Sequence, residues 1–264
     1  MDYSLENAQK FNWSSVTGNL DPERVSHLET YLVGKKILDA GCSGGAYVDF
    51  LARKGLEVTG VDKYDQFLAI AREKGLMGTY VQGDVTNLPF ADKTFDCTYC
   101  FDVLEHVDDW RAIQELTRVT TKRLILAVPQ KDELMNQFGL TFITYQDPTH
   151  LRYYTEDSLR YLVSKIPYSE VKIFAEGIIP LNFLFKEMLE KKKFNYSPLT
   201  LRPLYKLKFS NFLLNKIMNK IGSRFFNKLL EIDNSEEILI SYITTSEAFK
   251  KMNLGLVAVV ELDK

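Results

Sequence analysis

The sequence predicts an α/β protein built on a mostly parallel sheet that helices cover on both faces. Short β-rich stretches alternate with helical stretches from residue 36 to residue 175, which is the pattern that right-handed crossovers produce. A glycine-rich turn follows the first strand and precedes a helix. The chain has 264 residues, 45% of them hydrophobic, which is enough for one large core, although length alone would also allow two small domains. We expect one main domain with additions.

The expected elements follow in order from an N-terminal helical cap, residues 1–34, in which Asp21 and Pro22 mark a helix start. Six strands are expected, at 36–39, 57–62, 79–82, 95–100, 124–128 and 171–175. The helices between them are expected at 47–54, 66–74, 110–119 and 156–165. These elements make a core of residues 35–176. A largely helical insertion, 177–253, then interrupts the alternation of strands and helices. The segment 254–264 supplies a final strand at 254–262.

The cysteines and the N-terminal segment bear on where the protein works. Cys42, Cys97 and Cys100 are too few for a disulfide framework. Cys97 and Cys100 are three residues apart in an expected strand, so their side chains point to opposite faces, which disfavours a shared metal or disulfide. The first residues lack a basic stretch followed by an apolar block, and no apolar run is long enough to span a bilayer. We expect a cytoplasmic protein.

The turn at residues 41–45 is the most informative feature of the sequence. Gly41, Gly44 and Gly45 fall within five positions, between an apolar strand that ends in Asp39 and Ala40 and a stretch with helical spacing. Residues without a Cβ accept positive φ and let a ligand come close to the backbone amides. The turn is therefore predicted to hold a cofactor.

Acidic side chains follow two further strands, at the edge where open α/β sheets bind ligands. Asp62 lies 23 residues beyond Asp39, which suits a carboxylate that accepts both hydroxyls of an adenosine ribose. Asp84 follows the next strand and could hold an adenine amino group, with Val85 packing on the ring. A glycine turn with a ribose acid also occurs in dinucleotide dehydrogenases, so these features alone leave NAD open as the ligand.

Later motifs in the chain distinguish a dinucleotide from another adenosine-containing cofactor. Residues 38–45, 60–62, 83–84, 88–96 and 103–107 read LDAGCSGG, GVD, GD, LPFADKTFD and VLEHV in unbroken order. In this set the chain resembles the class I S-adenosylmethionine-dependent methyltransferases, specifically their small-molecule branches. The resemblance covers about residues 37–165. It implies a Rossmann-like, doubly wound sheet of seven strands with the last strand antiparallel, and S-adenosyl-L-methionine as the cofactor.

The resemblance also assigns cofactor-binding residues. It implies that backbone groups of the turn line the methionine part, that Asp62 binds the ribose, and that the Phe101 carbonyl meets the amino end. Ser43 stands where many relatives have glycine and adds a hydroxyl there. No lysine follows the glycines as in a phosphate-binding loop, in agreement with a sulfonium ligand. The full expected set is Asp39, Gly41, Cys42, Ser43, Gly45, Tyr47, Asp62, Lys63, Asp84, Val85 and Phe101.

The acceptor side is predicted from the segment 147–155, which resembles the family's acceptor-side motif. His150 titrates near neutral pH and is the candidate general base, and Arg152 and Tyr153 could orient a polar or anionic acceptor. His106 is a candidate acceptor contact. Structural roles stay open for both histidines, because His150 could only brace the helix that starts at Thr155 and His106 could only stabilise a helix start. No metal site is predicted.

Positive charge is concentrated between residues 186 and 230, with eleven Lys or Arg against two Glu. Lys216, Lys220, Arg224 and Lys228 recur every four residues beside an apolar stripe, which predicts an amphipathic helix. This helix could pack on the core, cover the acceptor, or contact a membrane through residues 203–230. Its aromatic residues merge with the apolar stripe, which makes nucleic acid a less favoured partner.

The sequence therefore predicts a methyltransferase that acts, at oxygen, on a small-molecule, glycan or lipid-linked acceptor. Peripheral membrane contact is an open addition to the cytoplasmic location. Two alternatives stay open at this stage. One is an RNA or protein methyltransferase that uses the basic segment, and the other is a cofactor-binding protein without catalytic turnover.

Overall fold

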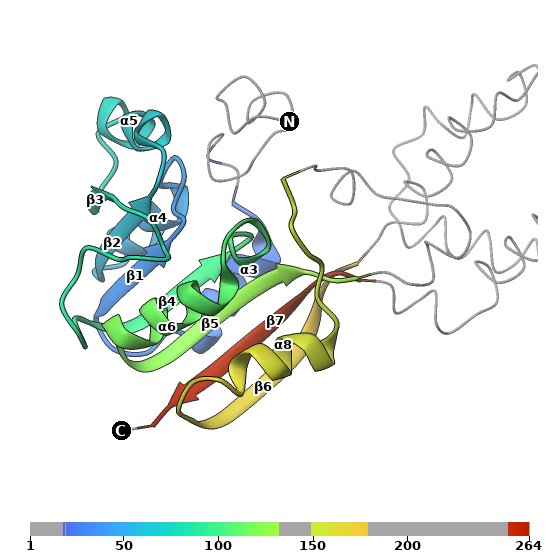
Figure 1. Cartoon of the computed structure of the whole chain (residues 1–264). Coiled ribbons are helices and arrows are strands. Elements are labelled where there is room, and N and C mark those ends of the chain that lie inside the picture. The colour runs from blue at the N-terminus through green and yellow to red at the C-terminus, as the bar shows by residue number, and fades with distance from the viewer. Residues whose placement is uncertain (1–17, 19, 132–148, 179–252, 264) are drawn as a thin grey trace, which may run out of the picture. The chain divides into compact units, whose positions relative to one another are not determined.

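The computed structural model describes residues 18, 20–131, 149–178 and 253–263 (Figure 1). The chain divides into two compact units, the first made of residues 1–131, 147–177 and 255–264, the second of residues 132–146 and 178–254. Nearly all described residues belong to the first unit. The predicted basic helix and membrane-contact segment, 203–230, lie outside the described residues. Among the described residues no helix combines the length and apolarity that a membrane crossing requires.

The first unit is built on a seven-stranded sheet in the order β3-β2-β1-β4-β5-β7-β6 (Figure 1). β1 pairs in parallel with both β2 and β4, and β4 pairs in parallel with β5. β7 runs antiparallel to β5, which confirms the expected reversal of the last strand. The strands are β1 (Lys36–Ala40), β2 (Glu57–Asp62), β3 (Thr79–Gln82), β4 (Phe95–Phe101), β5 (Thr120–Pro129), β6 (Tyr168–Ile178) and β7 (Asn253–Leu262).

Helices cover both faces because the central strands are apolar on both sides. In β5, Leu124 and Leu126 belong to one buried cluster, and Ile125 and Ala127 belong to the other. α6 (Asp109–Val119) and α8 (Glu156–Val163) contribute to the first cluster. α3 (Pro22–Tyr31), α4 (Ala46–Arg53) and α5 (Asp65–Glu73) contribute to the second. Cys97 and Cys100 are free and buried in opposite clusters, as their spacing predicts.

The strand bounds follow the sequence closely, except that β5 and β6 are longer than the expected 124–128 and 171–175. β5 begins directly at the end of α6. Its first residues, 120–123, are polar, so the hydrophobic pattern does not predict them as strand. The Thr120 hydroxyl is fully buried there and lies 2.5 Å from the Thr98 hydroxyl of β4. A side-chain hydrogen bond thus makes a polar residue compatible with a buried strand.

The sheet order reverses between β1 and β4, which are neighbours with helices leaving to opposite faces. Open parallel sheets bind their ligands outside the carboxyl ends of the strands at such a point. The glycine turn follows β1, on one side of this point. The 3-10 turn η1 (Leu104–His106) follows β4, on the other side. The fold therefore places the predicted site residues at one edge of the sheet.

Candidate cofactor and acceptor site

The glycine turn is tied to the neighbouring strand by its own amides. The N–H groups of Gly41 and Cys42 donate to the Val61 carbonyl at 2.8 and 3.0 Å. Gly41 and Gly45 have φ of +92° and +80°, and Ser43 between them has φ of +47°. Gly45 caps the N-terminus of α4 without a side chain. The turn therefore has a backbone shape fixed by its own hydrogen bonds, and it leads directly into the start of α4.

Gly41 is also the point at which the turn packs on the segment after β4. A Cβ added at Gly41 would lie 2.2 Å from Cγ2 of Val103, well inside van der Waals contact. The absence of a side chain thus lets two segments from the two sides of the reversal point touch. Because η1 follows Val103 directly, this contact links the cofactor turn to the acceptor side.

Replacing Gly41 with alanine is expected to destabilise the protein by about 2–3 kcal/mol and to weaken cofactor binding, because the positive φ and the contact with Val103 both add cost. Gly55→Ala is the matched control, since Gly55 has φ of +87° and no atom within 4 Å of the added Cβ. The Gly55→Ala variant should lose about 1 kcal/mol of folding free energy, from backbone strain alone. Equal losses in urea unfolding for the two variants would contradict the close approach to Val103.

Asp62 connects the end of β2 to the glycine turn. Its side chain is buried, and its two oxygens accept hydrogen bonds from the Ser43 N–H at 2.8 Å and the Tyr64 N–H at 2.9 Å. Burial raises the pKa of Asp62, and the backbone donors around it oppose that rise. Each carboxylate oxygen keeps a further lone pair, so the group can still accept from a ligand hydroxyl.

Asp39 lies beneath the turn, on β1, and is fully enclosed. Burial raises the pKa of Asp39 to about 8, an effect that the hydroxyl of Tyr99 partly offsets and the nearby charge of Asp62 increases. Asp39 therefore carries a proton at neutral pH while Asp62, with its backbone donors, is the better acceptor. The structure puts Asp39 in the floor of the predicted site, where it supports the turn.

The predicted adenine-side residues lie after β3. Asp84 accepts hydrogen bonds from the N–H and hydroxyl of Thr86 at 2.9 and 2.7 Å, and Lys63 lies 3.0 Å from its other oxygen. Partial burial raises the pKa of Asp84, but Thr86 and Lys63 outweigh it and bring the pKa below its ordinary value. Asp84 is therefore ionised, and Val85 beside it is buried in the core. Lys63, expected among the cofactor-binding residues, is the ion-pair partner of Asp84.

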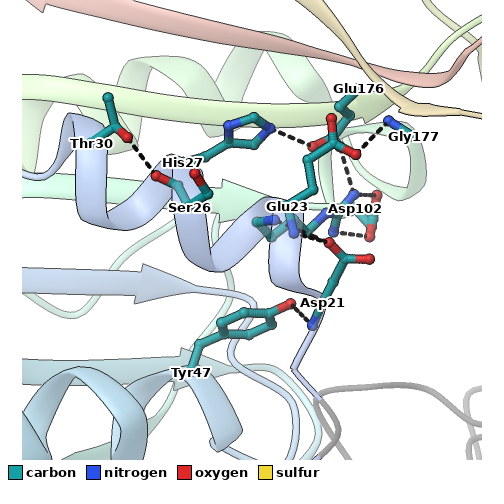
Figure 2. Close-up of polar contacts among 10 residues, drawn as sticks. Asp21, Glu23, Ser26, His27, Thr30, Tyr47, Asp102, Glu176 and Gly177 are labelled. Atoms are coloured by element: carbon teal, nitrogen blue, oxygen red, sulfur yellow. Dashed lines mark hydrogen bonds and ion pairs between the residues drawn. The ribbon is translucent and has the colours of Figure 1, made fainter.

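Phe101 ends β4 against aromatic and cationic neighbours. Its ring makes an edge contact with Tyr47 at 6.2 Å between centroids, and the Arg24 guanidinium lies 5.1 Å from its centroid. The Tyr47 hydroxyl in turn accepts a hydrogen bond from the Asp21 N–H at 3.2 Å, so α3 starts over α4 and the glycine turn (Figure 2). The start of α3 is thereby joined to α4.

Arg24 forms an ion-pair network that sequence reasoning missed (Figure 2). Its guanidinium binds both oxygens of Asp102, just after β4, and lies 2.8 Å from Glu176 on β6. Glu176 is buried, and His27 lies 3.4 Å from its other oxygen. The partners are 78 and 152 residues from Arg24 in the chain, so no local pattern could have indicated them.

Glu105, His106 and His150 form a compact group that we call the acceptor-side cluster. One ligand-type atom from each lies within 4.8 Å of the others, and the two imidazole rings are 4.6 Å apart between centroids. Nδ1 of His106 lies 3.2 Å from the Thr149 carbonyl. Two predicted acceptor-side residues, His106 and His150, are therefore brought together. Glu105 belongs to the same motif but was not predicted to take part.

Arg152 and Tyr153 lie beside this cluster. Arg152 donates to the carbonyls of Leu104 and Val107 at 2.8 and 2.5 Å, so its guanidinium holds the ends of η1. The Tyr153 ring packs on His150 at 5.2 Å. Both residues also border a surface cavity of about 310 Å³ beside α6 and α8. Their predicted contact with the acceptor stays a prediction, while the observed hydrogen bonds give Arg152 a bracing function.

The residues of the turn fit the cofactor that the sequence predicts. The Ser43 hydroxyl is buried at the turn without a hydrogen-bond partner among the described residues, a polar group available to a bound ligand. Asp62 can accept from hydroxyls, and the ionised Asp84 can accept from an amine.

Part of the chain is similar to known proteins. Residues 38–128 match the family model described as methyltransferase domain. The chain is 38% identical over 98 residues to the ubiquinone biosynthesis O-methyltransferase of Proteus mirabilis, covering 34% of this chain and 40% of that protein. It is 35% identical over 106 residues to the malonyl-[acyl-carrier protein] O-methyltransferase of Pectobacterium atrosepticum, covering 40% and 42%. The matches thus span about two fifths of these relatives.

The fold has counterparts among solved structures. A SAM-dependent methyltransferase from Archaeoglobus fulgidus superposes with a TM-score of 0.61 at 16% identity, covering 98% of this chain and all of that one. Phosphoethanolamine N-methyltransferase 2 of Haemonchus contortus, solved with S-adenosyl-L-methionine, superposes with a TM-score of 0.53 at 17% identity, covering 93% of this chain and 53% of that one. These likenesses confirm the predicted fold.

Proposed function

We propose that this chain, whose residues 38–128 form a class I S-adenosylmethionine-dependent methyltransferase domain, transfers a methyl group to an oxygen atom of a small-molecule acceptor. The observation that carries the proposal is the position of Asp62, a buried carboxylate fixed by two backbone amides against the glycine turn. Relatives named as O-methyltransferases support oxygen as the methylated atom.

The chain's own residues bind and orient the cofactor. Asp62 accepts from the ribose hydroxyls, Asp84 accepts from the adenine amino group, and Val85 packs on the ring. The Ser43 hydroxyl, which is buried at the turn, would receive the methionine carboxylate, and the Phe101 carbonyl would receive its amino group. The bound sulfonium supplies a methyl carbon whose bond to sulfur breaks as the bond to the acceptor oxygen forms. Because this displacement needs alignment more than a strong catalyst, orientation is the protein's main contribution.

The acceptor oxygen loses its proton at the acceptor-side cluster. His150 is the general-base candidate from the sequence, and it lies beside Glu105 and His106, which follow β4 and Val103 in the chain. A hydroxyl acceptor is a weak nucleophile until deprotonated, so a proton-accepting group at this point raises the rate. Arg152 and Tyr153 keep the cluster in place.

The finer parts of the proposal concern the acceptor and the location. A glycan or lipid-linked acceptor, a cytoplasmic location and membrane contact through residues 203–230 remain part of it, supported by the basic, aromatic composition of that segment. RNA as acceptor is not favoured, because neither relative is named for a nucleic acid, and the one relative whose name includes a protein is named for a malonyl group on acyl-carrier protein. A protein without turnover would need no proton-accepting cluster.

The proposal is tested by incubating the purified chain with S-adenosyl-L-methionine and a panel of acceptors grouped by chemistry. The panel comprises phenols, carboxylic acids, sugar hydroxyls and amines, and release of S-adenosylhomocysteine is measured. Turnover with hydroxyl or carboxyl acceptors above the no-acceptor background supports the proposal. Turnover confined to amines would contradict methylation at oxygen.

A further inference from the structure

We propose that Glu105, His106 and His150 bind a divalent transition-metal ion of the Zn²⁺ kind, which holds and activates the oxygen of the acceptor. The inference rests on the proposed function, because the ion would act on the acceptor hydroxyl of that reaction. Neither the sequence prediction nor the relatives' names include a metal. The evidence is the identity, spacing and support of three side chains.

The three ligand-type atoms are close enough for one ion. They lie within 4.8 Å of one another, and the His106 Nε2 is 3.7 Å from a Glu105 oxygen. A zinc ion with ligands at about 2.1 Å separates them by roughly 3.4 Å, so a small inward movement completes the site. Glu105 is 1% exposed, so a cation bound to its carboxylate would be shielded from water, and this shielding strengthens the attraction between the two charges.

The hydrogen bond of His106 gives the ring the tautomer that a metal requires. Its Nδ1 lies 3.2 Å from the Thr149 carbonyl and 3.1 Å from the Thr149 hydroxyl. A carbonyl can only accept and a hydroxyl can also accept, so both contacts are satisfied when Nδ1 carries the proton. In that tautomer Nε2, which lies 3.7 Å from a Glu105 oxygen, is the nitrogen that would bind the ion. Metal-binding histidines are commonly oriented in this way by a carbonyl on the second nitrogen.

The two segments that carry the ligands are joined firmly. The Leu151 N–H donates to the Glu105 carbonyl at 2.8 Å, which ties the residue after His150 to η1. Arg152 donates to the carbonyls of Leu104 and Val107, on either side of Glu105 and His106. These bonds fix the third ligand relative to the first two before any ion binds. The site is therefore preorganised by backbone contacts outside it.

Two imidazoles and one carboxylate suit a transition metal or zinc better than Mg²⁺, which prefers oxygen ligands. Three protein ligands leave a position open for the acceptor. An acceptor hydroxyl bound there releases its proton to water, since coordination lowers its pKa. The metal-bound oxygen then forms its bond to the methyl carbon while the carbon–sulfur bond breaks and sulfur keeps the electron pair. In this scheme His150 is a ligand of the ion, so lowering of the acceptor's pKa by the ion replaces direct proton transfer to His150.

The test titrates ZnCl₂ into the full-length chain after chelator treatment and dialysis. We expect one Zn²⁺ per chain, bound more tightly than Mg²⁺ in a parallel titration. His106→Ala and His150→Ala should each weaken Zn²⁺ binding on the order of 100-fold. His27→Ala is the matched control, because His27 is the third histidine of the chain and lies on α3 beside Glu176. Its affinity for Zn²⁺ should stay that of the unmodified chain.

Two further measurements identify the ligands of the ion and separate the metal proposal from the proposed function. Co²⁺ bound to the unmodified chain should give the visible absorption bands of an ion with few ligands. It should give no thiolate charge-transfer band, which would show that the buried cysteines are not ligands. Absence of stoichiometric Zn²⁺ binding, tighter binding of Mg²⁺, or a thiolate band would overturn the inference. S-adenosylhomocysteine is titrated into the same metal-free chain. Its binding without Zn²⁺ binding removes only the ion, whereas failure to bind it contradicts the proposed function itself.

Discussion

Asp62→Ala is expected to weaken the binding of S-adenosylhomocysteine by about 30-fold to 1000-fold, equivalent to about 2–4 kcal/mol. The carboxylate would lose two charge-assisted hydrogen bonds to the ribose hydroxyls. It would also release the Ser43 N–H, which the Asp62 side chain holds at 2.8 Å, so the glycine turn loses part of its orientation. Isothermal titration of both proteins measures the difference directly.

Asp65→Ala is the matched control for this variant. Asp65 lies three residues further along, at the start of α5, and its exposed side chain pairs with Arg72 at 2.8 Å. Its removal should leave the affinity for S-adenosylhomocysteine unchanged. Thermal unfolding of both variants shows whether the domain remains folded. An affinity for Asp62→Ala within about threefold of the unmodified chain would remove Asp62 from the ribose site.

Arg24→Ala is expected to lower the free energy of unfolding by about 2–4 kcal/mol, because it leaves the buried Glu176 without its cation and breaks two bonds to Asp102. Urea unfolding measures the change. Arg160→Ala removes a surface ion pair with Glu156 and should cost less than about 1 kcal/mol. A second substitution, Glu176→Gln, should restore part of the loss, since a neutral amide tolerates burial better than an unpaired carboxylate.

The loss should depend on pH with a definite sign. Burial raises the pKa of Glu176, and Arg24 opposes that rise, so the Arg24→Ala variant has the higher folded pKa. A raised folded pKa favours folding below the unfolded pKa, and that contribution disappears as the pH rises through the folded pKa. The deficit of the variant should therefore be small at acid pH and grow toward neutral pH. A deficit that shrinks as the pH rises would contradict the role of Glu176.

The cofactor side of the site could be predicted because its information is local. The glycine turn, Asp62 and Asp84 each follow a strand within a few residues, and a parallel sheet brings those strand ends to one edge. The resemblance to the methyltransferase family then named the individual residues, and their contacts with the cofactor stay predictions. The exact hydrogen bonds, such as Ser43 N–H to Asp62, needed the structure, because they depend on the register of β1 and β2.

The remaining parts depend on contacts across long stretches of chain. Arg24 contacts Asp102 and Glu176 through the tertiary fold, and no periodic pattern in the sequence predicts these contacts. Arg152 shows a different limit. Its charge suggests an anionic ligand, whereas in the structure one of its guanidinium nitrogens donates to the carbonyls of Leu104 and Val107. His106 and His150 are 44 positions apart in number, and their contact with Glu105 emerges from the docking of residues 149–154 on η1.

The most direct test of the central claim is isothermal titration of the unmodified chain with S-adenosyl-L-methionine, S-adenosylhomocysteine and NAD. The glycine turn, the ribose acid Asp62 and the adenine-side Asp84 predict saturable binding of the two adenosyl ligands at one site per chain and no binding of NAD. Binding of NAD alone would contradict the account, because it would mean that the same turn and acid serve a dinucleotide.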